Sequence, residues 1–380
     1  MSHSRRQFVT QSLMALLAST VASQLEGQQA PAPGTPPAFG TAPPVGPEVS
    51  ASTFSEAEKL VRIELNEHER SEAAENWRQS MAAVYERRTG PRTLEIPDDV
   101  PPYSYWNPVL PGESAGPTQD RFVRSTQDAG ALPQNAPDIA YAPVWRLSQW
   151  LQKRQITSEK LTQIYLDRIQ QFDPKLRCII TLTPDLALKQ ARQADAEISS
   201  GHYRGPLHGI PFGVKDLLDT AGIKTTYGAE PFRDRVPDKN SAVVDRLQKA
   251  GAVLLAKLSL GALALNDVWF GGQTLNPWNL DEGSSGSSAG PGAATAAGLV
   301  GFSIGSETEG SIAGPSMRCG VTGLRPTFGR VPRSGAMTLS WSMDKLGPMA
   351  RSVEDTMFVL QAISGPDRGD VSSVPSHLDY

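Results

Sequence analysis

The stretch that decides the fold of this chain runs from Gly283 to Gly323, GSSGSSAGPGAATAAGLVGFSIGSETEGSIAGPSMRCGVTG. It is rich in glycine, serine and alanine, a composition that is typical of linkers. Here it encloses the apolar run Ala293 to Ile304 and stands between two segments with ordinary core residues. Small residues in such a setting let backbone approach backbone, or a ligand, closely. The stretch therefore predicts a tightly packed functional centre, with Ser287, Ser288 and Ser311 as candidate side chains.

The composition of the chain limits its partners. It has 380 residues, enough for one large domain or two ordinary ones, and a net charge of −4 from interspersed charges of both signs. That charge gives no reason to expect nucleic acid as a partner. The body of the chain has no long apolar run, so we expect no membrane-spanning helix in the mature protein. Cys178 and Cys319 stand outside any metal-ligand pattern and are expected to be buried thiols or, after export, a disulfide. Neither a metal nor a cofactor is predicted.

Residues 1–29 have the pattern of a twin-arginine signal. Arg5 and Arg6 precede a modestly apolar run, which small residues follow. This order of features predicts export to the periplasm or another extracytoplasmic place, with a membrane tether if the signal stays uncleaved. A disordered basic N-terminus is the alternative interpretation.

Three further segments precede a compact domain. Residues 30–50 are rich in proline and glycine and predict an extended linker. Residues 51–90 predict a helical extension, with one long helix from Phe54 to Arg88, or one broken near residues 69–71. This extension is expected to pack on the main domain or on a partner subunit. In the second case the protein could be a homodimer. Residues 91–137 predict a proline-rich connecting coil, and residues 138–380 the domain that carries the chemistry.

Helical and strand patterns alternate from residue 138 onward, which favours a mixed α/β sheet. The first helix is expected to begin after a cap at Thr157 or Ser158 and to end before Pro174. Further expected elements are strands over residues 178–182, 205–216 and 251–256, and helices over residues 185–199 and 243–250.

Lys215 ends the apolar run Ile210–Val214 and directly precedes Asp216. A lysine in that place either emerges at the surface and pairs with Asp216, or is buried, has a lowered pKa and serves as a base. Ser311 follows Gly310 at a predicted turn, whose amides would suit an oxyanion hole or would only cap the next segment. No histidine is well placed to activate the serines, so a serine nucleophile would depend on Lys215.

The sequence GSSAG at 286–290 also matches G-x-S-x-G, the nucleophile elbow of α/β-hydrolases. That motif requires a strand immediately before it and a histidine after it. The preceding residues 276–283 are turn-like, and the only later histidine is His377. We therefore do not assign the chain to that class.

Six linked motifs follow one another along the chain: GIPFGVKD at 209–216, TLNPWN at 274–279, GSSAG at 286–290, GSETEGSI at 305–312, CGVTGLRPTFGRV at 319–331 and GPMARSVED at 347–355. In these motifs, from about residue 138 to its end, the chain resembles the amidase signature family. Ser287 precedes Ser311 by 24 positions (311 minus 287), which is the family's own spacing. The fold that this resemblance implies is an α/β amidase-signature fold, a mixed, mostly parallel twisted sheet covered by helices, here with an N-terminal helical extension.

The resemblance implies a catalytic triad. Ser311 would be the nucleophile, Ser287 the bridge, joined to Gly286 by a cis peptide bond, and Lys215 the base. The substrate would be a small-molecule amide, hydrolysed without a cofactor through an acyl-enzyme. The implied oxyanion amides are those of Thr308, Glu309, Gly310 and Ser311, and the supporting residues are Gly286, Ser288 and Asp216.

The chain departs from the family pattern in several places. Glu307 and Ala313 stand where the family often has Asp and Arg, and Glu309 replaces the first of two glycines. We expect Glu307 to pair with Arg318 instead. Family domains normally continue well past Tyr380, so a C-terminally truncated or catalytically inactive amidase-like protein is one alternative. An amidotransferase subunit is another alternative. The predicted export argues against it, because such subunits work in the cytoplasm.

Overall fold

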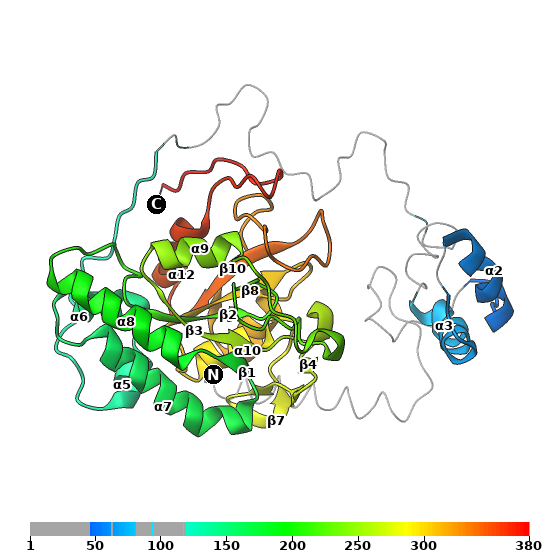
Figure 1. Cartoon of the computed structure of the whole chain (residues 1–380), viewed down its shortest axis with the longest axis horizontal. Helices are drawn as coiled ribbons and strands as arrows, with labels where there is room; N and C mark the ends of the chain where they lie inside the picture. Colours follow the sequence, from blue (N-terminus) through cyan, green and yellow to red (C-terminus); the bar gives the residue numbers. More distant parts are fainter. Residues whose placement is uncertain (1–45, 62–63, 81–92, 94–116, 118, 380) are drawn as a thin grey trace, which may run out of the picture. The chain divides into compact units, whose positions relative to one another are not determined.

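The structure is a computed structural model that describes residues 46–61, 64–80, 93, 117 and 119–379. The signal-like segment 1–29 lies outside the described residues, as do most of the linker and residues 81–90 of the predicted extension. The chain divides into two units, residues 1–101 and residues 102–380 (Figure 1).

Two helices, α2 (Ala51–Val61) and α3 (Glu67–Ser80), form the described part of the first unit. The prediction of one long helix is therefore wrong, and the second helix begins before the alternative break at residues 69–71. Asn66 accepts a hydrogen bond from the Glu69 amide at 3.0 Å, and Glu69 accepts one from the Asn66 amide at 2.7 Å. This reciprocal capping box starts a new helix at Glu67.

A six-stranded sheet is the centre of the second unit, in the order β1-β3-β2-β8-β10-β9 (Figure 1). The predicted mixed sheet is confirmed. Among the described strands of this sheet, however, parallel pairing is confined to β2 with β3 and β2 with β8, and the other neighbours pair antiparallel. The expectation of a mostly parallel sheet thus holds only at its centre. The strands are β1 (Ile179–Leu182), β2 (Pro211–Lys215), β3 (Val253–Leu258), β8 (Phe302–Glu307), β9 (Thr322–Gly323) and β10 (Lys345–Ala350).

Helices pack against this sheet, α7 and α8 against β3, and α10 and α12 against β10. Of the two predicted caps, Thr157 is the one that caps α7, since its side chain accepts from the Lys160 amide at 3.0 Å. The helix continues through Pro174 and ends where Arg177 adopts the left-handed conformation, so the predicted end was too early. The helices are α5 (Ala136–Ala140), α6 (Val144–Gln152), α7 (Ser158–Leu176), α8 (Pro184–Ser199), α9 (Ala242–Lys249), α10 (Ala289–Ala296), α11 (Ala313–Cys319) and α12 (Val353–Ile363).

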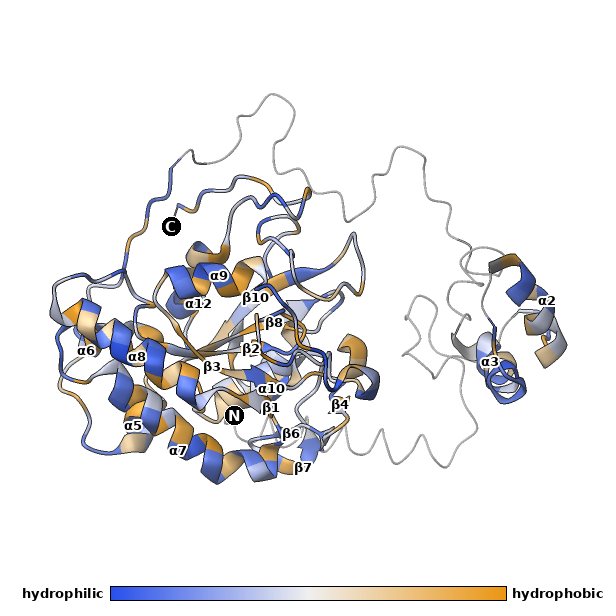
Figure 2. Ribbon diagram, viewed as in Figure 1, coloured by the Kyte–Doolittle hydropathy of each residue, from blue (hydrophilic) through white to orange (hydrophobic). Residues whose placement is uncertain are grey.

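The core lies between these helices and the sheet, and hydrophobic residues alternate with hydrophilic ones along α7 and α8 (Figure 2). Cys178 and Cys319 are free and buried, so the prediction of buried thiols is confirmed. The small residues of the quoted stretch are needed for close packing. A Cβ at Gly290 would lie 2.4 Å from the Ser259 nitrogen and 2.5 Å from the Cys178 carbonyl oxygen. Only glycine therefore lets α10 approach β3 this closely.

The residues before the first serine motif form a hairpin, β6 (Leu275–Asn276) with β7 (Asn279–Gly283), rather than a plain turn. A second short pair, β4 (Val268–Trp269) with β5 (Gly272–Gln273), lies just upstream. Among the described residues, no helix is long and apolar enough to cross a membrane.

Candidate active site

Lys215 ends β2 near the middle of the sheet, and its side chain is fully buried. Its Nζ lies 2.7 Å from Ser287 Oγ, 2.8 Å from Ser306 Oγ and 3.1 Å from Ser288 Oγ. Burial lowers the pKa of Lys215 well below its usual range, against the opposing charges of two more distant carboxylates. The site therefore favours an uncharged amine surrounded by three hydroxyl groups.

Asp216 does not pair with Lys215. Its Oδ1 lies 3.0 Å from Lys257 Nζ, and both side chains are fully buried. Its Oδ2 accepts from the amide and the hydroxyl of Thr226, at 2.8 and 2.6 Å. The interpretation in which Lys215 emerges at the surface and pairs with Asp216 is therefore wrong. Because Lys257 balances the carboxylate, Lys215 has no ion-pair partner within the described part of the chain.

The hydroxyl group of Ser288 fixes the direction of these hydrogen bonds. Ser288 Oγ donates to the Ser306 carbonyl oxygen at 3.0 Å and accepts from the Ser306 amide at 3.1 Å. Its only proton is thus in use, so it accepts a hydrogen bond from Lys215. A neutral amine keeps one more N–H and a lone pair, which face Ser306 and Ser287. The arrangement leaves Lys215 able to accept a proton from Ser287.

Ser306 also contacts Lys215. It lies within the motif at 305–312, which predicts no role for it. The parallel register places Val214 beside Ile304, and this brings the ends of β2 and β8 together. Ser306 and Lys215 follow those two residues along their strands. The register of β2 and β8 identifies Ser306 as a neighbour of Lys215. That register is a property of the folded sheet, so it could not be taken from the sequence.

The two serines of the implied triad lie on neighbouring segments. The Gly286–Ser287 peptide bond is cis, as the resemblance implied. A Cβ at Gly286 would lie 1.8 Å from the Asn266 carbonyl oxygen, so this position requires glycine. The amide of Ser288 donates to the carbonyl oxygen of Ser311 at 3.1 Å, which ties the two segments together. Ser287 is buried, whereas Ser311 is half-buried and accessible.

The turn from Glu309 to Ser311 presents free backbone donors. None of the hydrogen bonds among the described residues uses the amides of Glu309, Gly310 or Ser311. Gly310 has φ +143°, a conformation that favours glycine. Unpaired amides beside an accessible serine are the donors that an oxyanion requires.

Glu307 holds this turn in place. It is buried at the end of β8, and its Oε2 accepts from the amides of Ile312 and Ala313, both at 2.8 Å. The expected pair with Arg318 is wrong, because Arg318 contacts Glu282 at the surface, at 2.9 Å. Helix α11 carries Arg318 to its last turn, away from Glu307. Arg325 lies 3.4 Å from Glu307 instead.

Thr308 is held by Asp344, which directly precedes β10, and by Lys345, the first residue of β10. Its hydroxyl donates to Asp344 Oδ1 at 2.6 Å, and its carbonyl oxygen accepts from Lys345 Nζ at 2.9 Å. Neither residue belongs to the motifs that predicted the site. The described residues contain no cluster of His, Cys, Asp and Glu side chains that could hold a metal ion.

This fold and this lysine–serine arrangement agree with the comparison to known families. A family model described as Amidase matches residues 160–379, more than half of the chain. The chain belongs to the amidase signature family.

Individual relatives carry several names. A glutamyl-tRNA(Gln) amidotransferase subunit of Heliobacterium modesticaldum is 40% identical over 239 residues, 62% of this chain and 48% of that protein. The structure of native peptide amidase from Stenotrophomonas maltophilia is 40% identical with a TM-score of 0.59, covering 62% of this chain and 50% of its own. Fatty acid amide hydrolase is 27% identical with a TM-score of 0.61, covering 66% and 46%. The chain thus spans about half the length of the relatives that it matches.

Proposed function

We propose that this protein hydrolyses a carboxylic amide, R–CO–NH–R′, through an acyl-enzyme on Ser311. The observation that carries the proposal is the fully buried Nζ of Lys215, 2.7 Å from Ser287 Oγ, with no carboxylate paired to it among the described residues. Burial favours the neutral amine, which is the form that can act as a base. Similarity to a peptide amidase and to a fatty acid amide hydrolase supports an amide as the substrate.

In the first half of the reaction, Ser311 Oγ attacks the amide carbonyl carbon. The Ser311 proton passes to Ser287 Oγ, and the Ser287 proton passes to Lys215 Nζ. The C–N bond then breaks, and a proton returns from Lys215 through Ser287 to the leaving nitrogen, which departs as an amine or ammonia. In the second half water attacks the acyl ester by the same relay, releasing the carboxylic acid and restoring Ser311.

The turn from Glu309 to Ser311 would stabilise the negative oxygen that forms in both steps. One such backbone donor contributes about 3 kcal/mol to transition-state stabilisation in comparable sites. Glu307 fixes the turn through the next two amides, so the donors are positioned before substrate binds.

The similarity to amidotransferase subunits favours a second candidate function, an amidotransferase component that acts with partner proteins. The two functions differ in what the isolated chain can do. An amidase hydrolyses a simple amide by itself, whereas a component of the second kind would require its partners.

The test measures ammonia release by the purified chain from a panel of simple amides and peptide amides. We expect turnover that Ser311→Ala and Lys215→Ala abolish and Ser287→Ala strongly lowers. Ser200→Ala, at an exposed serine that ends α8, is the matched control and should keep full activity. A fluorophosphonate probe should label the wild type and not Ser311→Ala. Absence of both turnover and labelling in folded protein would favour the catalytically inactive alternative.

We also propose that the protein works outside the cytoplasm, because of the twin-arginine pattern at Arg5 and Arg6. Residues 1–45 fused to a folded reporter should direct it across the cytoplasmic membrane, and replacing both arginines by lysine should stop this transport. Retention of the wild-type fusion in the cytoplasm would contradict the proposal.

A further inference from the structure

The buried cation of Lys345 contacts the turn that carries the proposed oxyanion donors. Lys345 is the first residue of β10 and stands opposite Glu307 of β8 in the antiparallel pairing. It is 9% exposed, and its Nζ donates to the Thr308 carbonyl oxygen at 2.9 Å. In the described part of the chain no carboxylate forms an ion pair with it. The side chain is therefore directed at one backbone oxygen rather than at a counter-ion.

The Thr308–Glu309 peptide bond connects this contact to the donors of the turn. The bond is trans, so the carbonyl oxygen of Thr308 and the amide hydrogen of Glu309 point in opposite directions within one plane. Because Lys345 holds the oxygen, it also sets the direction of the Glu309 N–H, which none of the hydrogen bonds among the described residues uses. A charged donor on the oxygen also polarises the peptide group, which strengthens its N–H as a donor.

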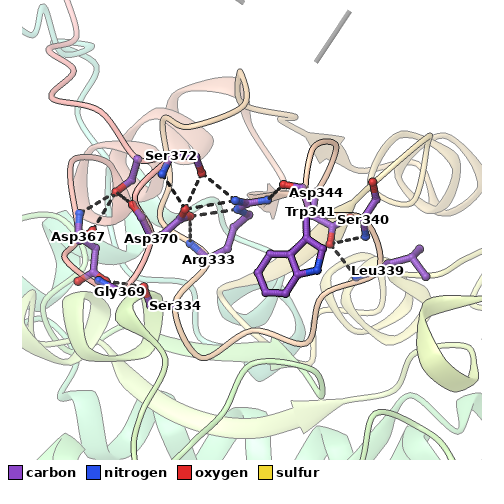
Figure 3. Close-up of polar contacts among 11 residues, drawn as sticks. Arg333, Ser334, Leu339, Ser340, Trp341, Asp344, Asp367, Gly369, Asp370 and Ser372 are labelled. Atoms are coloured by element: carbon purple, nitrogen blue, oxygen red, sulfur yellow. Dashed lines mark hydrogen bonds and ion pairs between the residues drawn. The ribbon is translucent and has the colours of Figure 1, made fainter. Parts of the chain in front are cut away.

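Asp344 fixes both Thr308 and the segment from which Lys345 projects. Its Oδ1 accepts from the Thr308 hydroxyl at 2.6 Å. Its Oδ2 accepts from the amides of Leu339 and Ser340, at 2.7 and 3.0 Å (Figure 3). The loop ahead of β10 is thus closed on the residue directly before Lys345. Two adjacent residues therefore hold Thr308 at its hydroxyl and at its carbonyl oxygen.

Arg333 anchors the same loop to the C-terminal part of the domain (Figure 3). Its Nη1 donates to the Trp341 carbonyl oxygen at 2.7 Å, and its Nε donates to Asp370 at 3.0 Å. Its Nη2 donates to the Ser372 hydroxyl at 2.7 Å. These contacts fix the start of β10 independently of the turn, so Lys345 has a set position from which to hold Thr308.

The charges around the turn create a need for a cation there. Burial lowers the pKa of Lys345, and Arg325 adds to this effect. Three nearby carboxylates act in the opposite direction, those of Glu307, Asp344 and Glu309. An oxyanion that forms at the turn would be repelled by these carboxylates. The Arg325 side chain is 60% exposed, so solvent screens its charge, whereas the charge of Lys345 is buried and acts on the turn with less screening.

We propose that Lys345 is a positioning residue for the oxyanion site: through the Thr308 carbonyl oxygen it orients and strengthens the Glu309 N–H as a donor to the oxyanion. The inference rests on the proposed amide hydrolysis and adds a residue that lies outside the motifs that predicted the site. Lys345 does not touch the substrate. Its effect is exerted in the transition state, where the negative charge develops, and not in substrate binding.

The first experiment measures how fast a fluorophosphonate probe labels Ser311. Ser311 Oγ forms a bond to phosphorus as the P–F bond breaks, fluoride leaves, and the serine proton passes to Ser287. The phosphoryl oxygen takes up negative charge, as the carbonyl oxygen of an amide would. In Lys345→Met we expect the maximal labelling rate constant to fall about tenfold, with the half-saturating probe concentration within about twofold, because only the transition state loses a donor. Lys345→Arg keeps a cation with N–H donors and should recover most of the rate.

Lys153→Met is the control, at an exposed lysine that pairs with Asp128, and should keep the wild-type rate constant. Equal rate constants for the wild type and Lys345→Met would overturn the inference. A smaller labelled fraction at an unchanged rate constant would show a purely structural role and would overturn it as well. A wild type that is labelled but hydrolyses no amide would refute the proposed function alone, whereas a wild type that is neither labelled nor active would refute both.

A second experiment observes the peptide group itself and requires no reaction. Thr308–Glu309 is the one Thr–Glu pair in the sequence. Threonine labelled with ¹³C at the carbonyl carbon and glutamate labelled with ¹⁵N therefore give a single correlation peak in the NMR spectrum. We expect this peak to shift in Lys345→Met and to stay in place in Lys153→Met. An unshifted peak in Lys345→Met would show that the cation does not act on this peptide group, and would overturn the inference whatever the labelling rates are.

Discussion

Replacing Lys215 by methionine should remove a pH dependence from the stability of the protein. Burial lowers the pKa of Lys215 well below the value of 10.5 for a lysine in solvent. Between the folded and unfolded pKa values the unfolded chain binds one more proton at this residue than the folded protein does. The free energy of unfolding therefore rises with pH in that window, by about 1.4 kcal/mol per pH unit for one proton. Below the folded pKa both states are protonated and this slope disappears.

The measurement is urea unfolding of the wild type and of Lys215→Met at about pH 8 and about pH 9. Subtracting the wild-type free energy of unfolding from that of Lys215→Met gives a difference that should fall as the pH rises over this interval, by up to about 1.4 kcal/mol. Burial also lowers the pKa of Lys257, but that residue titrates in both proteins and cancels in the difference. Lys189→Met, at an exposed lysine of α8, should keep the wild-type slope.

Parallel profiles for the wild type and Lys215→Met would refute this reasoning. They would mean that Lys215 carries the same charge in both states, and a protonated lysine cannot accept the proton of Ser287. The stability experiment therefore tests the proposed base without requiring that any substrate be known.

Three further predictions concern the structure that supports the site, each with its own comparison variant. Glu307→Ala should lower the free energy of unfolding by about 3 kcal/mol. Glu307→Gln keeps an acceptor for both amides and should lower it by only about 1 kcal/mol. Equal losses for the two variants in urea titrations would contradict this. Lys257→Met should lower the free energy of unfolding by about 4 kcal/mol, because Asp216 stays buried without a cation. Adding Asp216→Asn should restore much of this loss, as measured by thermal unfolding. If the double variant shows no recovery, the two residues are not coupled. Gly290→Ala places a Cβ 2.4 Å from a backbone nitrogen and should cost about 2 kcal/mol or more. At Gly292 a Cβ would meet no atom closer than 3.1 Å, the nearest being a side-chain carbon and, at 3.2 Å, the carbonyl oxygen of Pro315. Gly292→Ala should therefore cost less, and the opposite order in urea unfolding would refute the packing argument.

Structural features that depend on residues adjacent in the sequence could be predicted from the sequence alone. Thr157 caps α7 because a hydroxyl stands directly before an amphipathic run, and β2 ends at Lys215 because its apolar run ends there. The linked motifs, read as a resemblance, led to Lys215 and Ser287 and to the cis peptide bond after Gly286. Such signals are local, so they are present before any long-range contact forms. The capping box at Asn66 is equally local, so the start of α3 was also predictable from its residues.

Which charges and hydroxyl groups meet depends instead on the tertiary structure. Asp216 pairs with Lys257, 41 positions away (257 minus 216), because β2 and β3 lie side by side. Lys215 is thereby left without a counter-ion and surrounded by hydroxyl groups, Ser306 among them. The stretch from Gly283 to Gly323 contains Glu307, which holds its turn, but Asp344 and Lys345, which hold Thr308, come from 36 and 37 positions further along the chain. Partners of this kind are set by strand order and register, which arise from burying the whole core rather than from any one segment.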